Sequence, residues 1–118
     1  MTRSISRIPA PSVPPVVHGG VRYEQVGNGL LEGLDQMGGY LAAVDEMTGE
    51  RLWVLKVYDN RRQPGREGDA QDVFFRSMAW MPDNTLRIVN ERGAGFVVDP
   101  ATRSVHPDPA GHQGRGRE

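Results

Sequence analysis

VDEMTGERL at residues 44–52 and VDPATRSV at residues 98–105 are two copies of one strand-turn-strand pattern. In both copies a run of β-favouring residues ends in aspartate, a threonine follows three positions later, and an apolar residue opens the next segment. The carboxylate of Asp45 or Asp99 can accept hydrogen bonds from backbone N–H groups two and three residues further on. The pattern therefore predicts two structural turns that each join a pair of antiparallel strands.

The two turns differ at the position after the threonine. Thr48 is followed by Gly49, and glycine adopts positive φ at no steric cost. Thr102 is followed by Arg103, so either Arg103 tolerates the same backbone or the second turn is of another type. In both turns the threonine hydroxyl is a second, weaker acceptor for backbone N–H groups.

β-Branched and aromatic residues, which favour strands, recur between short polar or glycine-rich connections. Strands are expected at 16–26, 39–44, 51–58, 73–80, 85–90 and 96–98, with another after the second turn. Gly19 and Gly20 are interpreted as a bend or bulge inside the first of these, and residues 30–37 as a loop or at most one turn of helix. Short connections favour a meander. We expect an all-β fold, an antiparallel meander of about six or seven strands forming a small barrel or a strongly twisted sheet.

Composition limits the classes of function. A chain of 118 residues with net charge -1 fits one domain and lacks the excess of positive charge that would attract nucleic acid or an anionic membrane. The chain has no cysteine, which excludes disulfides and thiol chemistry and is compatible with the cytoplasm, the location we expect. Prolines interrupt the amino terminus, so no signal peptide is expected. The predicted organisation is a proline-rich flexible arm at 1–15, a β domain at 16–106 and a disordered tail at 107–118.

One stretch resembles a known repeat. Residues 39–53 read GYLAAVDEMTGERLW, which resembles the blade repeat of quinoprotein-like (PQQ-like) β-propellers, where a strand runs into an Asp-x-x-Thr-Gly turn and the next strand carries a tryptophan. Residues 84–105 look like a weaker copy of half a blade. The resemblance implies structural roles: packing for Trp53, and turn formation for Asp45, Thr48, Asp99 and Thr102. No residue matches a quinone pocket or its metal ligands, so the oxidoreductase activity of some propellers is not carried over, and no cofactor is expected.

Few residues suggest catalysis. His18, His106 and His112 have no metal-ligand spacing, and solvated histidines are the preferred interpretation. The carboxylates Glu67, Asp69 and Asp72 lie beside arginines, as expected for a charge-balanced surface loop. No nucleophile motif or phosphate loop is present, so no catalytic residue and no metal site are predicted, and an enzyme is the less favoured class.

The aromatic residues are more suggestive, because nearly all fall in expected strands. Strand alternation places Phe74, Arg76, Met78 and Trp80 on one side of the segment 73–80. The residues proposed to line a pocket or an interface are Tyr23, Trp53, Tyr58, Asp72, Arg76 and Trp80. The alternative role of the four aromatic residues in this set is packing in the core.

Two hypotheses follow. The first is a non-enzymatic binding or protein-interaction module, with the charged loop 59–70 as its main contact element. The alternative is a small-ligand-binding β-barrel or small enzyme that uses an aromatic-lined pocket. Exposed strand edges also predict a homodimer, so the expected partner is another protein or a second copy, a small molecule being possible.

Overall fold

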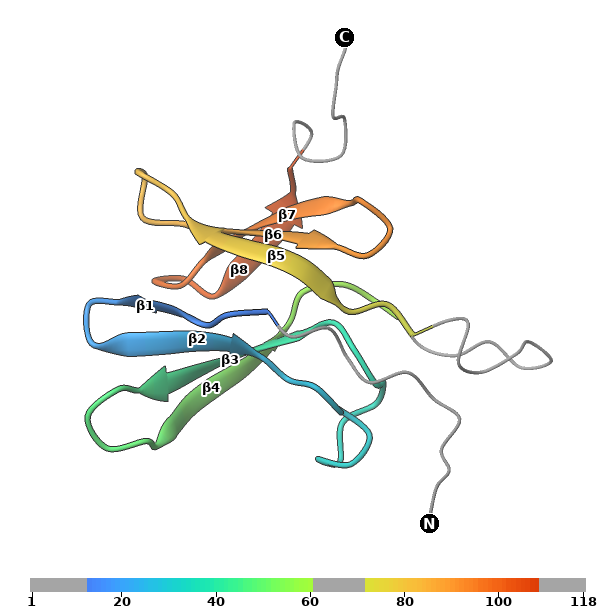
Figure 1. Ribbon diagram of the computed structural model, residues 1–118, viewed down its shortest axis with the longest axis horizontal. Helices are drawn as coiled ribbons and strands as arrows, with labels where there is room; N and C mark the ends of the chain where they lie inside the picture. Colours follow the sequence, from blue (N-terminus) through green and yellow to red (C-terminus); the bar gives the residue numbers. More distant parts are fainter. Residues whose placement is uncertain (1–12, 61–71, 109–118) are drawn as a thin grey trace, which may run out of the picture.

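Each copy of the repeated pattern forms the turn between the last two strands of a four-stranded antiparallel sheet (Figure 1). The computed structural model describes residues 13–60 and 72–108. The first sheet has the order β1 (Val16–His18), β2 (Val21–Gln25), β3 (Tyr40–Asp45), β4 (Arg51–Lys56). The second has the order β5 (Phe75–Trp80), β6 (Leu86–Asn90), β7 (Gly95–Asp99), β8 (Ser104–Pro107).

The all-β antiparallel meander predicted from the sequence is confirmed, because neighbours along the chain are neighbours within each sheet. The prediction of a barrel is wrong: the strands form two separate sheets that pack face to face (Figure 1). Residues 57–74 separate β4 from β5, too many for the tight turns that join the strands within each sheet, and β4 and β5 do not pair.

The predicted strand at 16–26 is in fact two strands, which brings the described residues to eight strands rather than six or seven. Gly19 and Gly20 have φ of 61° and 81° and form a two-residue hairpin turn instead of a bend. Positive φ at both central residues is the type I′ geometry that matches the twist of paired strands. Val16 consequently lies opposite Tyr23, in register across the turn.

The predicted alternation in residues 73–80 is also wrong in part. The β5–β6 register shifts between Phe75 and Ser77, which leaves Arg76 as an extra residue in a β-bulge. Because a bulge reverses the side on which the preceding residues lie, Phe75 shares the inner face with Met78 and Trp80, while Arg76 is exposed.

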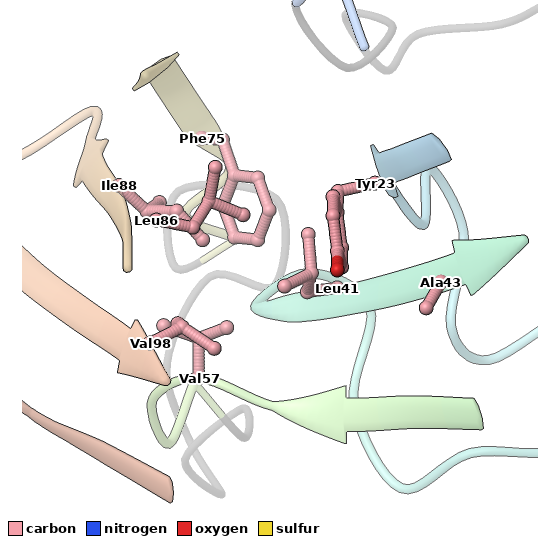
Figure 2. Packing of buried hydrophobic residues seen from close by; sticks show 8 residues of the cluster. All are labelled: Tyr23, Leu41, Ala43, Val57, Phe75, Leu86, Ile88 and Val98. Atoms are coloured by element: carbon pink, nitrogen blue, oxygen red, sulfur yellow. The ribbon is translucent and has the colours of Figure 1, made fainter. Parts of the chain in front are cut away.

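The core lies between the two sheets (Figure 2). Both sheets contribute fully buried side chains, and the largest are Phe75, Leu41, Leu86, Ile88 and Val98. Val13, from the segment predicted as a flexible arm, packs against this core. Residues 1–12 of that arm and residues 109–118 of the predicted tail lie outside the described residues, whereas Pro107, the first residue of that tail, ends β8.

A second, smaller cluster covers the outer face of the first sheet. The connection 27–39 consists of turns, and it packs Leu34 against Val26, Tyr40 and Ala42. Gly29 is required there, since a Cβ at this position would lie 2.1 Å from the carbonyl oxygen of Gln36.

The buried side-chain amide of Gln36 holds together the two ends of the connection between the sheets. Gln36 is 2% exposed; its Nε2 donates to the carbonyl oxygens of Gly38 and Tyr58, both at 2.8 Å, and its Oε1 accepts from the Asn60 N–H at 2.8 Å. Asn60 Oδ1 in turn accepts from the Val73 N–H at 2.6 Å, just before β5. These bonds tie the end of the first sheet to the start of the second.

Candidate functional site

Four hairpin turns lie together at one end of the two sheets, on the left in Figure 1. They are residues 19–20, 46–50, 81–85 and 100–103, and we call this end the turn end. The connection 26–39, the described residues 57–60 and 72–74, and the turn 91–94 lie at the opposite end, because strand direction alternates along each meander.

Aromatic rings form a continuous row between the sheets toward the turn end. His18 stacks on Trp80 with 4.0 Å between ring centroids and 14° between planes, and Trp80 stacks on Tyr23 at 5.7 Å and 28°. Tyr23 meets Trp53 at 6.2 Å and 50°. The Arg103 guanidinium lies over Trp53, 5.9 Å from its centroid. We call these four rings with Arg103 the aromatic ladder.

Strand register explains how the ladder forms. Tyr23, Ala43 and Trp53 lie opposite one another across β2, β3 and β4, all on the inner face. The small side chain of Ala43 between them leaves room for the two large rings to approach each other. Trp80, on the inner face of β5, completes the contact from the second sheet.

The middle of the aromatic ladder is buried, and the residues at its two ends are exposed. Tyr23 is only 6% exposed, and burial raises the pKa of its phenol. Trp53 and Trp80 are half-buried, whereas His18 and Arg103 are exposed. Aromatic surface next to a guanidinium can form stacking and cation–π contacts with a partner.

The turn that carries Arg103 has the same backbone as the turn that carries Gly49. φ is 58° at Arg103 and 77° at Gly49, and the two N–H groups donate to the carbonyl oxygens of Asp99 at 2.7 Å and Asp45 at 2.8 Å. The alternative left open by the sequence is thereby settled: Arg103 adopts the left-handed conformation. This conformation directs its side chain from the second sheet onto Trp53 of the first.

Side chains support both turns. Asp45 Oδ1 accepts from the N–H groups of Met47 at 2.9 Å and Thr48 at 3.1 Å, and Asp99 Oδ1 accepts from that of Ala101 at 3.0 Å. Thr48 Oγ1 accepts from the Glu50 N–H at 3.1 Å. The hydroxyl of Thr102 instead lies 2.8 Å from that of Ser104, so the two threonines differ in their partners.

Of the six residues proposed for a pocket or interface, the structure brings together Tyr23, Trp53 and Trp80. Tyr58 lies at the opposite end, where its hydroxyl donates to the Val73 carbonyl at 2.7 Å and its ring stacks on Phe96 at 5.2 Å. Burial raises the pKa of Tyr58 well above its usual value.

The other two proposed residues also lie away from the ladder. Asp72 precedes β5 at the opposite end, and Arg76 is exposed at the bulge. The proposed contact loop 59–70 falls mostly outside the described residues. Of its first residues, Asp59 Oδ1 lies 3.3 Å from Lys56 Nζ, and Asn60 belongs to the Gln36 network.

Sequence reasoning missed two members of the ladder. His18 is exposed, as expected for a solvated histidine, but its ring also stacks on Trp80, because its place just before Gly19-Gly20 puts it at the end of a hairpin strand beside β5. Arg103 was noted only as a departure from glycine. That departure was the available signal, because a residue other than glycine at positive φ is uncommon and often has a local function.

An open groove of about 450 Å³ lies on the outer face of the second sheet. Arg87, Val97 and His106 cross it as one row of opposed residues on β6, β7 and β8. Arg87 Nε lies 2.7 Å from Asp108 Oδ2, an ion pair at the edge of the row. Arg87 and Asp108 could therefore offer polar contacts to a small ligand.

Within the described ranges, no group of three His, Cys, Asp or Glu side chains is placed to hold a metal ion. His112 lies outside these ranges. No helix in the described part of the chain has the length and apolar character needed to cross a membrane.

Comparison of the chain with models of known protein families, with curated proteins and with solved structures found no match.

Proposed function

We propose that the protein is a non-enzymatic protein-interaction module whose contact surface is the turn end. The observation that carries the proposal is the aromatic ladder, with half-buried Trp53 and Trp80 beside exposed Arg103 and His18. Tryptophan, tyrosine and arginine are enriched among the few residues that supply most of the binding energy at protein interfaces. A cytoplasmic module fits the lack of cysteine.

Exposed apolar side chains in and just after the turn 46–50 add to this surface. Met47, in the turn between β3 and β4, is 91% exposed, and Leu52, at the start of β4, is 47% exposed. A methionine that projects freely from a turn adapts to many partner shapes, because its side chain is flexible and polarizable. The turn end therefore combines fixed rings with an adaptable apolar contact.

A small-ligand-binding or enzymatic function is the second candidate. The groove on the outer face of the second sheet, with the Arg87–Asp108 pair, supports it. The aromatic ladder argues for the first candidate instead, since its rings contact one another and contribute half-buried surface at the end of the molecule.

The blade resemblance enters here as a proposal. Each sheet is a four-stranded meander, the same turn joins its last two strands, and β1 lies beside β5. We propose on these grounds that the two sheets are blade-like repeats of one unit.

Affinity capture from a lysate of the native source tests the proposed function. The variant carries His18→Glu, Met47→Asp and Arg103→Asn at the turn end, and the matched control carries Arg92→Glu in the exposed turn at the other end. We expect one identified protein to be captured by the unaltered chain and by the control, and to be lost with the turn-end variant. Capture by all three proteins alike, or by none, would overturn the assignment.

A further inference from the structure

β4 is the edge strand at one side of the first sheet. It pairs with β3 on one side, and in residues 13–60 and 72–108 no strand pairs with its other side. An edge strand presents backbone N–H and C=O groups that can pair with a further strand.

The backbone hydrogen bonds between β3 and β4 show which of these groups point outward. The Val57 N–H donates to the Gly39 carbonyl oxygen at 2.7 Å. Since bonded positions alternate along an antiparallel pair, Leu55 and Trp53 also direct their backbone groups toward β3. Val54 and Lys56, between them, direct theirs away from the sheet.

The other edges are less suited to pairing. β1 has three residues, β5 is interrupted by the bulge at Arg76, and β8 ends in Pro107, which has no N–H. β4 has six residues without proline or glycine, and its centre is apolar. Its one irregularity is the register shift near Leu52, opposite Ala43 and Val44.

The charges that flank β4 are already neutralised within the chain. Arg51 Nη1 lies 2.6 Å from Glu32 Oε1. Lys56 Nζ lies 2.8 Å from Asp35 Oδ2 and 3.3 Å from Asp59 Oδ1. Two copies of this strand therefore meet without the repulsion that bare arginine and lysine would cause, and the net charge of -1 adds little long-range repulsion.

We propose that β4 pairs antiparallel with β4 of a second copy of this chain, so that two first sheets join into one continuous sheet. The two-fold axis passes at Leu55, which places Val54 of each copy opposite Lys56 of the other. This register uses both outward-facing residues and avoids the irregular part at Leu52. It forms about four inter-chain backbone hydrogen bonds, two for each bonded pair. On the inner face it sets Leu55 against Leu55 and Trp53 against Val57, so apolar side chains meet.

This interface shares Trp53 with the aromatic ladder, but it contains none of the exposed turn-end residues His18, Met47 and Arg103, and it does not depend on the proposed partner contact there. Variants of His18, Met47 and Arg103 are expected to keep the self-association. Variants of Val54 are expected to keep partner capture. Failure of one proposal is thus distinguishable from failure of the other.

Single cysteines test the register directly, because the natural chain has none. Leu55→Cys puts two thiols at the two-fold axis in a non-hydrogen-bonded pair, where Cα atoms are about 4.5 Å apart, within the range that a disulfide needs. Leu52→Cys is the control on the same strand. We expect Leu55→Cys to form the disulfide dimer at least tenfold faster under mild oxidation. Equal rates, or faster reaction of the more exposed Leu52→Cys, would overturn the register.

Light scattering at micromolar concentration tests the pairing itself. Val54→Pro removes an outward N–H without removing a bond to β3, and Val54→Thr keeps the N–H with a side chain of similar shape. We expect the dimer mass for the natural chain and for Val54→Thr, and the monomer mass for Val54→Pro. A monomer mass for the natural chain, or a dimer mass for a folded Val54→Pro, would overturn the proposal. If Val54→Pro does not fold, the cysteine result decides.

Discussion

Gly49 and Arg103 occupy the same left-handed position in two copies of one turn, so exchanging the residue types measures what that conformation costs. Gly49→Ala adds a Cβ to a backbone at φ 77°, with no atom within 4 Å of the added Cβ. No clash contributes, so the folded state carries the backbone cost alone. Left-handed backbone costs a non-glycine residue about 1–2 kcal/mol. The lower flexibility of alanine in the unfolded chain offsets about 0.5–1 kcal/mol of this cost, so we expect Gly49→Ala to lower the free energy of unfolding by about 1 kcal/mol.

Arg103→Gly removes the same kind of cost in the second turn, where φ is 58°. The relief of about 1–2 kcal/mol is offset by loss of the cation–π contact with Trp53, about 0.5–1 kcal/mol, and by the greater flexibility of glycine in the unfolded chain, about 0.5–1 kcal/mol. These contributions nearly cancel, so the expected net change is close to zero, in contrast to the loss expected for Gly49→Ala.

Urea unfolding followed by tryptophan fluorescence measures the free energy of unfolding of both variants. The melting temperature should change in the same direction, by about 4–8 °C for each kcal/mol. The reasoning is refuted if Gly49→Ala is as stable as the natural chain. It is also refuted if Arg103→Gly loses more than about 2 kcal/mol, since the strain argument allows no such loss.

Three further changes test the core, the passage between the sheets and the effect of pH, and urea unfolding measures each. Phe75→Ala empties a fully buried site in the core, with an expected loss of about 3–5 kcal/mol; a loss below 1 kcal/mol would contradict the packing. Gln36→Leu keeps the side-chain size but removes three hydrogen bonds from buried backbone groups; we expect a loss of about 2–4 kcal/mol, and an unchanged stability would contradict the network. Hydrogen bonds from Lys56 and then Tyr40 lower the pKa of Asp35 from 3.8 to about 2. The contribution of Asp35 to stability is therefore present above pH 3.8 and lost as the pH falls toward 2. Asp35→Asn should flatten the pH dependence of the free energy of unfolding in that window. An unchanged slope would count against the ion pair of Asp35 with Lys56.

Local features of this fold could be predicted from the sequence. Asp45 and Asp99 follow β-rich runs, and the hydrogen bonds of each to its own turn depend only on neighbouring residues. The bulge at Arg76 could not be predicted, because it depends on how β5 meets β6, and the alternating pattern of residues 73–80 is equally compatible with an unbroken strand. Closure into a barrel was likewise not predictable from the sequence, because it depends on whether β4 and β5 pair, and the strand patterns of the two segments do not say whether they do.

The candidate site also combines features that the sequence predicts with features that it does not. Tyr23 and Trp53 could be placed on strands, and β2–β3–β4 register then brings them together across Ala43. Trp80 and Arg103 join them only because the two sheets pack face to face, a contact between segments far apart in the chain. Sequence periodicity places residues on a face, but it does not say which face of another sheet they meet.

The central claim is that the turn end is the surface that binds a partner protein. The chain has two tryptophans, Trp53 and Trp80, and both belong to the aromatic ladder, so their indole N–H signals in a nitrogen–proton NMR spectrum report on the ladder. Titration with the captured partner is predicted to shift or broaden both signals and the amides of residues 46–50 and 100–103. Unchanged indole signals, with shifts confined to the opposite turn at 91–94, would contradict the account.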